Sequence, residues 1–248
     1  MRKRINILKI NFDNLEKKEV EFSISDSIRR GKQISIFTPN PEILLKAYNS
    51  PDLIDILNSS ELVLPDGIGI VIASRILKTP LKERITGIDT GEFILRYANK
   101  HSLRVFLLGG KAGVAEVAAE KLSLKYPSLN VCGTHHGYFE KSGNENKAVI
   151  EKINLASPDI VFVCFGFPEQ EKWIHKNRAL ISSVKIYAGL GGSIDVWAGN
   201  KRRAPLPIQK AGLEWAWRIM LEPRRIRVIF RIPKFLNMVI CQNAKKSN

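Results

Sequence analysis

The chain has 248 residues, of which 44% are hydrophobic and 25% are charged, with 17 Gly and 12 Pro. This composition is typical of a globular protein and excludes collagen-like, low-complexity and fully disordered chains. The net charge of +15 is unusually large and makes nucleic acid, an anionic membrane and phosphorylated substrates candidate partners. Most of this charge lies after residue 200, where 12 basic residues are opposed only by Glu214 and Glu222.

Short apolar runs alternate with amphipathic stretches along most of the chain, which predicts alternating strands and helices. The order indicates an α/β fold with a mostly parallel, Rossmann-like sheet and helices on both faces. A change in composition near 200–207 divides an α/β domain (1–200) from a basic helical appendage (201–248), which Pro223 and Pro233 are expected to break into short helices. Strands are expected at 5–10, 34–37, 61–64, 104–108, 130–133, 159–165 and 185–188, and helices up to 30 and at 41–49, 51–58, 68–77, 89–100, up to 125, 144–156 and 168–181.

The cysteines indicate the redox environment of the protein, and the hydropathy indicates whether it spans a membrane. Cys132, Cys164 and Cys241 show no paired spacing, which favours a reducing environment over a disulfide-bonded secreted fold. No apolar run approaches the roughly 20 residues that a spanning helix needs. We therefore expect a soluble or peripheral protein.

Polar side chains follow several of the predicted strands. One predicted strand is followed by Thr38 and Asn40, a second by Asp66 and a third by Gln170. In parallel sheets, ligands bind at the carboxyl ends of the strands. These four side chains are therefore expected at one edge. Asp66 has two interpretations: it caps the following helix, or it is a general base whose pKa burial raises.

Glycine-rich turns and a pair of histidines leave alternatives open. The turn at Gly109 and Gly110, and the one at Gly191, either admit a phosphate at a helix N-terminus or are tight structural turns. His135-His136 has no acidic or thiol partner at metal-ligand spacing, so we expect no metal there. The chain also contains no Asp-x-Asp, the carboxylate pattern that many nucleotide-sugar enzymes use to hold a divalent cation.

The tail from residue 213 interleaves large apolar residues with arginines. One interpretation is a C-terminal helix packed on the core with a solvated basic face. The other, which we favour, is an interfacial segment that binds an anionic membrane surface through both its apolar and its basic side chains.

Together these motifs resemble those of the WecG/TagA/CpsF family of bacterial glycosyltransferases (glycosyltransferase family 26), with the TagA branch the most similar. The resemblance extends from about residue 5 to residue 231, and the ordered set is more specific than any single motif. The motifs are Thr38-Pro39-Asn40, Pro65-Asp66-Gly67-Ile68-Gly69, Glu83-Arg84-Ile85-Thr86-Gly87, Gly137-Tyr138-Phe139, Gly166-x-Pro168-x-Gln170-Glu171, Gly189-x-Gly191-Gly192, Arg203-Ala204-Pro205 and Leu213-Glu214-Trp215.

The resemblance implies an inverting enzyme that needs no metal or other cofactor. It would move a sugar from a UDP-sugar donor to an undecaprenyl-diphosphate-linked acceptor, as a peripheral protein at the cytoplasmic face of the bacterial membrane. In the TagA branch the sugar is N-acetylmannosamine, added β-1,4 to GlcNAc in the linkage unit of wall teichoic acid. The uronic acid of N-acetylmannosamine and hexoses are alternative donor sugars within the family.

The resemblance also assigns roles to residues at matching positions. Asp66 matches the family's catalytic base. Thr38, Asn40, Arg84 and Gln170 match its substrate-binding residues. Arg218, Arg224 and Arg227 match appendage arginines that would bind the diphosphate, and self-association in solution, with the appendage completing the site at the membrane, is a further hypothesis.

Two other classes of protein fit parts of the pattern. An NAD-dependent oxidoreductase would explain the glycine turns, but no acidic residue follows a complete fingerprint near the N-terminus. A nucleic-acid-binding protein would explain the charge, but the aliphatic residues of the tail favour lipid, and we expect no nucleic acid partner.

Overall fold

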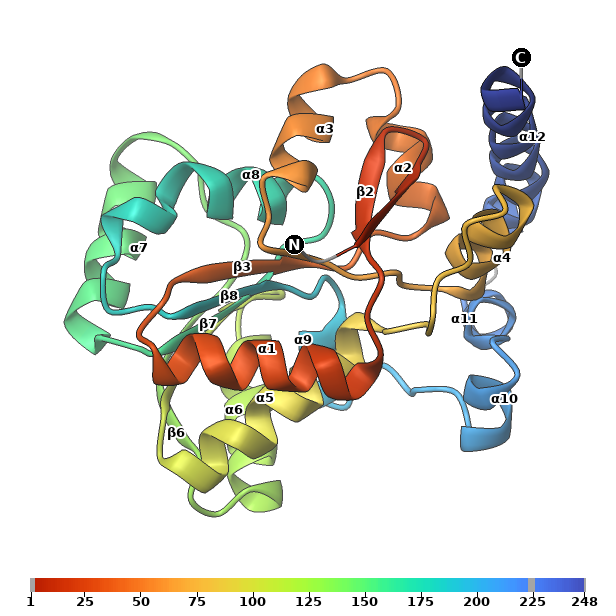
Figure 1. The fold of residues 1–248 in the computed structure, drawn as a ribbon. Coiled ribbons are helices and arrows are strands. Elements are labelled where there is room, and N and C mark those ends of the chain that lie inside the picture. The colour runs from red at the N-terminus through yellow and green to blue at the C-terminus, as the bar shows by residue number, and fades with distance from the viewer. Residues whose placement is uncertain (1–2, 223–225, 248) are drawn as a thin grey trace.

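The computed structural model describes residues 3–222 and 226–247 (Figure 1). Its centre is a six-stranded, fully parallel sheet with the order β4-β3-β8-β7-β5-β6, which confirms the predicted α/β fold. The inner strands read as continuous apolar runs because helices cover both faces of the sheet. The strands are β3 (Ile34–Phe37), β4 (Leu62–Val63), β5 (Arg104–Gly109), β6 (Asn130–His135), β7 (Ile160–Cys164) and β8 (Ile186–Gly189).

Two layers of helices enclose the sheet, and each layer has its own apolar core (Figure 1). One layer contains α1 (Lys17–Arg29), α5 (Gly87–His101), α6 (Val114–Lys125) and α9 (Ser193–Trp197). The other contains α2 (Pro41–Ala47), α3 (Pro51–Asn58), α4 (Ile68–Ile76), α7 (Gly143–Ala156) and α8 (Glu169–Asn177), which continues into the 3-10 turn η1 (Arg178–Leu180). The single helix expected at 168–181 therefore ends earlier, in a tighter turn.

The N-terminal segment differs from the predicted strand at 5–10. It is an antiparallel hairpin of β1 (Arg4–Ile7) and β2 (Ile10–Asp13), separate from the main sheet. The chain reverses at Leu8 and Lys9, which have φ values of 45° and 71°. Such values are uncommon for residues other than glycine, and here the Leu8 N–H donates to Gln242 Oε1 at 2.8 Å. The turn thus depends in part on a contact with the far end of the chain.

The appendage contains α10 (Leu206–Lys210), α11 (Glu214–Leu221) and α12 (Arg227–Ser247), and α12 lies beside α4 and α2 (Figure 1). The prediction that Pro233 breaks the helix is wrong, because α12 continues through it. The break expected at Pro223 lies outside the described residues. A proline inside a helix costs about 3 kcal/mol. Full burial of Phe235 and Val239 against the core of the body offsets that cost.

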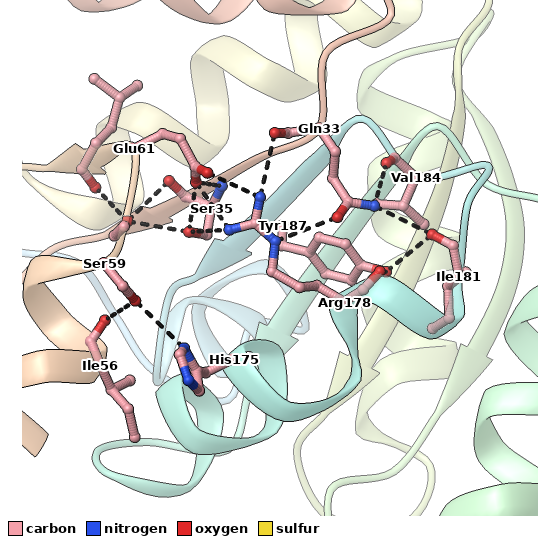
Figure 2. A network of polar contacts seen from close by, with 12 residues as sticks. Gln33, Ser35, Ile56, Ser59, Glu61, His175, Arg178, Ile181, Val184 and Tyr187 are labelled. Carbon is pink, nitrogen blue, oxygen red and sulfur yellow. Dashed lines mark hydrogen bonds and ion pairs between the residues drawn. The ribbon is translucent and has the colours of Figure 1, made fainter. Parts of the chain in front are cut away.

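A polar network ties strands together at their amino ends, away from the loops that follow them (Figure 2). Glu61, just before β4, accepts the N–H of Ser35 in β3 at 2.7 Å. Arg178 binds both Glu61 carboxylate oxygens, at 2.9 and 3.0 Å. This network holds the short edge strand β4 in register with β3.

Candidate active site

Asp66 lies in the loop between β4 and α4. Helix α4 begins after Gly67 and has no side-chain cap, so Asp66 does not cap it. Its carboxylate instead accepts a hydrogen bond from the backbone N–H of Gly87, the first residue of the 15-residue helix α5. The positive end of a helix dipole stabilises an anion at this position.

The surroundings of Asp66 shift its pKa. Burial raises the pKa from 3.8 to about 6, and the negative charge of Glu214 adds to the rise. The positive charges of Arg218 and Arg84 and the hydrogen bond from Gly87 act in the opposite direction. A carboxylate with a pKa near 6 is ionised at neutral pH yet basic enough to accept a proton in a reaction, which suits a general base.

Arg84 belongs to an ion-pair network that joins the body to the appendage. It donates to the carbonyl oxygen of Gln209 at 2.9 Å and pairs with Glu214 at 3.3 Å. Glu214 also pairs with Arg203 at 3.3 Å, and Arg203 pairs with Asp89 at 2.7 Å. No local sequence pattern predicted that Glu214, whose charge acts on Asp66, would pair with both Arg84 and Arg203.

A close contact of the appendage with the body lies next to this network. Gly212, between α10 and α11, has φ +74°, and a Cβ at this position would lie 3.1 Å from the side chain of Ile68. Ile68 begins α4, two residues after Asp66. Glycine therefore lets the chain approach closely enough to bring α11, with Glu214 and Arg218, to the loop of Asp66.

Thr38 and Asn40 follow β3 on the same edge of the sheet. A Cβ at Gly87 would lie 2.8 Å from Thr38 Oγ1, so Thr38 stands directly against the start of α5, where Asp66 is bound. Asn40 is the N-cap of α2, and its Oδ1 accepts the N–H of Ile43 at 3.1 Å. Thr38 and Asp66 thus lie together, whereas the Asn40 side chain is partly committed to capping.

Gln170 is buried at the start of α8. Its Oε1 accepts the N–H of Gly191 at 2.9 Å and the N–H of Gly166 at 3.2 Å. The structure therefore brings Gln170 and Gly191 together. It uses the Gln170 amide for contacts within the protein, a role that sequence did not predict.

Gly109 and Gly110 form a tight exit from β5. A Cβ at Gly109 would lie 2.5 Å from the carbonyl oxygen of Cys164 in β7, so the two strand ends pack too closely for any side chain there. The carbonyl oxygen of Gly110 accepts the N–H of Gly137 at 2.8 Å. This geometry supports the interpretation as a structural turn, and phosphate binding there stays a prediction.

The three appendage arginines differ in how much of each side chain the structure describes. Arg218 is exposed on α11, and its charge acts on Asp66. Arg224 lies outside the described residues, and Arg227 is placed only by its backbone, as the first residue of α12. Arg218 is therefore the appendage arginine that the structure connects to the candidate site.

The described part of the chain offers neither a cluster of metal ligands nor a membrane-spanning helix. No group of three or more His, Cys, Asp or Glu side chains is arranged to hold a metal ion within residues 3–222 and 226–247. Over the same ranges, no helix has the length and apolar character required to traverse a bilayer. His135 makes a local contact instead, from its Nδ1 to the carbonyl oxygen of His136 at 2.8 Å.

Comparison with known proteins defines the class of this fold and site. The model of the glycosyl transferase WecG/TagA/CpsF family matches residues 5–248. The chain is 40% identical over 211 residues to an N-acetylglucosaminyldiphosphoundecaprenol N-acetyl-beta-D-mannosaminyltransferase of Bacillus subtilis (strain 168), covering 85% of this chain and 80% of that protein. It is 35% identical over 235 residues to the protein of the same name from Staphylococcus aureus (strain MRSA252), covering 94% and 91%.

The α/β body with its basic appendage is therefore an enzyme that transfers a glycosyl group. The chain belongs to the WecG/TagA/CpsF glycosyltransferase family and is of the TagA type. The family and the enzyme class predicted from the motifs are confirmed, and the oxidoreductase alternative is set aside.

Proposed function

We propose that the enzyme transfers N-acetylmannosamine from UDP-N-acetylmannosamine to undecaprenyl-diphosphate-linked GlcNAc, forming the β-1,4 linkage unit of wall teichoic acid. The half-buried Asp66 carboxylate, with a pKa of about 6 and two arginine charges acting on it, carries the chemical part of the proposal. The choice of donor and acceptor is supported by the names of the similar proteins from Bacillus subtilis and Staphylococcus aureus.

The proposed reaction is a single displacement with inversion at the anomeric carbon. Asp66 takes the proton of the acceptor hydroxyl, the hydroxyl oxygen bonds to the anomeric carbon, and the bond from that carbon to UDP breaks. Arg84 and Arg218 stabilise the negative charge that develops on the leaving diphosphate. Arg224 and Arg227 are proposed for the same task from their sequence positions.

The remaining predicted residues are proposed to position the substrates. Thr38 and Asn40 follow β3, the strand next to β4, which leads to Asp66. They would contact the sugar or the nucleotide. The turns at Gly109, Gly110 and Gly191 would let neighbouring backbone N–H groups approach the diphosphate, while the N–H of Gly191 itself donates to Gln170. Gln170 would act through the loops that it holds.

We also propose that the appendage contacts an anionic membrane surface, where the lipid-linked acceptor resides. Exposed apolar and basic side chains lie on the same two helices, which is the composition of an interfacial segment. They are Trp215, Arg218, Met220, Leu221, Ile229, Phe230, Arg231, Lys234 and Ile240.

The central test measures transfer from a panel of UDP-sugars to a lipid-diphosphate-GlcNAc analogue. UDP-N-acetylmannosamine should give the highest kcat/KM, and Asp66→Asn should reduce turnover by roughly 10²–10⁴-fold with the fold retained. Asp52→Asn, at an exposed aspartate of α3, is the matched control and should leave turnover unchanged. Preference for a UDP-hexose or a UDP-uronic acid would overturn the donor assignment, and wild-type turnover in Asp66→Asn would overturn the base.

Membrane contact is tested separately by co-sedimentation with phosphatidylglycerol vesicles. Phe230→Ser should weaken vesicle binding, because Phe230 is 76% exposed on α12. Phe22→Ser, at a phenylalanine 64% exposed on α1, is the control and should bind as the wild type does. Equal loss in both variants, or no binding by the wild type, would refute the assignment of the appendage as the membrane contact.

A further inference from the structure

Glu171 is a buried acid that the proposed reaction does not use. It lies in the first turn of α8, and only 1% of its surface is exposed. Burial raises its pKa to about 7, and the nearby charge of Glu169 adds to the rise. Its Oε2 makes no hydrogen bond within the described part of the chain. Burying such a group costs free energy, so its presence calls for a compensating role.

The other carboxyl oxygen of Glu171 has one partner. Gln170 Nε2 donates to Glu171 Oε1 at 2.9 Å, and Gln170 itself is 4% exposed. The opposite end of the same amide, Gln170 Oε1, accepts two backbone N–H groups, those of Gly166 and Gly191. One carbonyl oxygen with two lone pairs is thereby fully used.

The two glycines lie in separate loops at the carboxyl edge of the sheet. Gly166 follows β7 and has φ +85°, and Gly191 follows β8 and has φ +52°. Both strands are neighbours in the sheet, and β8 also pairs with β3, where Phe37 is opposite Gly189. Gln170 therefore holds together two loops that adjoin the loop of Thr38.

The orientation of the Gln170 amide decides whether this contact exists. With the amide turned by 180°, its NH₂ group would meet two backbone N–H donors and the hydrogen bonds would be lost. We propose that Glu171 is a positioning residue: its Oε1 accepts from Gln170 Nε2 and thereby selects the amide orientation that holds the Gly166 and Gly191 loops. The link from these loops to donor binding rests on the proposed function, whereas the positioning itself does not.

The test compares two replacements of Glu171 by the hydrogen exchange of individual backbone amides, measured by NMR. Glu171→Met removes the acceptor, and exchange at Gly166 and Gly191 should accelerate about tenfold. Glu171→Gln keeps a carbonyl acceptor for Gln170 Nε2, so both amides should exchange as in the wild type. Glu171→Ala provides the same comparison as Glu171→Met without added bulk, should the methionine prevent folding.

A second buried polar network on the same helix supplies the matched control. Trp173 Nε1 donates to Asn146 Oδ1 at 2.7 Å, and Asn146 also donates to Asn177 at 3.0 Å. Asn146→Ala should lower Tm while leaving exchange at Gly166 and Gly191 unchanged. Equal acceleration in Asn146→Ala would show a general loss of stability and would overturn the proposal.

Kinetics provide an independent readout. Glu171→Met should raise KM for the UDP-sugar more than it lowers kcat, and Glu171→Gln should restore KM. The double variant Gln170→Met/Glu171→Met should be no worse than Gln170→Met alone, because Glu171 acts through Gln170. Additive losses, or Glu171→Gln as impaired as Glu171→Met, would overturn the positioning role. Absence of transfer from every UDP-sugar with the exchange pattern intact would reject the proposed function and leave the positioning role standing.

Discussion

The Asp66 carboxylate accepts the backbone N–H of Gly87, 21 positions further along the chain, at the first residue of α5. This contact orients the Asp66 side chain, which makes no capping bond to the helix α4 that follows it. Glu214 and Arg218, from the appendage, act on the same carboxylate with opposite charges. The body and the appendage therefore set the basicity of one side chain together.

The raised pKa of Asp66 predicts a cost in stability. The pKa is about 6 in the folded protein and about 3.8 in an unfolded chain, so the folded state binds the proton more tightly. The stability that this proton contributes is present below pH 3.8 and is lost as the pH rises through 6. At pH 8, Asp66→Asn should stabilise the protein by up to about 3 kcal/mol, measured by urea unfolding. An equal or lower free energy of unfolding for the variant at pH 8 would contradict the raised pKa.

The pH dependence of turnover should report the same group. With Asp66 as the base, kcat/KM should fall as the pH drops below about 6, because the carboxyl becomes protonated. Glu214→Gln removes a negative charge that raises the pKa of Asp66 and should move this acid limb to lower pH. A limb that stays in place, or that moves to higher pH, would show that Asp66 is not the titrating group.

Docking of the appendage predicts a stability difference between two phenylalanines of α12. Phe235 is fully buried, so Phe235→Ala should destabilise the protein by about 3–5 kcal/mol. Phe230, 76% exposed on the same helix, is the matched control, and Phe230→Ala should change the free energy of unfolding by less than about 0.5 kcal/mol. Equal effects of the two changes in urea unfolding would show that α12 is not packed on the body in solution.

The network at the amino ends of the strands predicts a stability effect without a catalytic one (Figure 2). Arg178→Met should destabilise the protein by about 2 kcal/mol, because it leaves the partly buried Glu61 unpaired. His175→Ala removes only an exposed contact with Ser59 and serves as the control. Activity of folded Arg178→Met should match the wild type, and a large change in KM would contradict the separation of this network from the site.

The same network predicts how the difference in stability between the wild type and Arg178→Met depends on pH. Burial acts to raise the pKa of Glu61, but the hydrogen bonds from Arg178 and Ser35 outweigh it and the pKa is lowered. The stabilisation is therefore present above the pKa of a glutamate in an unfolded chain and is lost as the pH falls through the lowered pKa. The gap in stability between wild type and Arg178→Met should narrow in acid, as urea unfolding at several pH values would measure.

The class of fold and the loops of the candidate site could be predicted from the amino-acid residues alone. Hydrophobic periodicity is a local property, so it predicts the order of strands and helices. Because the strands are parallel, the loops of Thr38, Asp66 and Gln170 lie at one edge of the sheet. The ordered motifs also identified the glycosyltransferase family, which the family match confirms.

The contacts between distant side chains could not be predicted in this way. The N–H of Leu8 in the N-terminal turn donates to Gln242, 234 residues away. Helix α12 continues past Pro233, and Phe235 of this helix is buried against the body. Glu214 reaches Arg84 only because the appendage folds back onto the body. Such contacts depend on the packing of distant segments, whose free energy no local pattern of residues encodes.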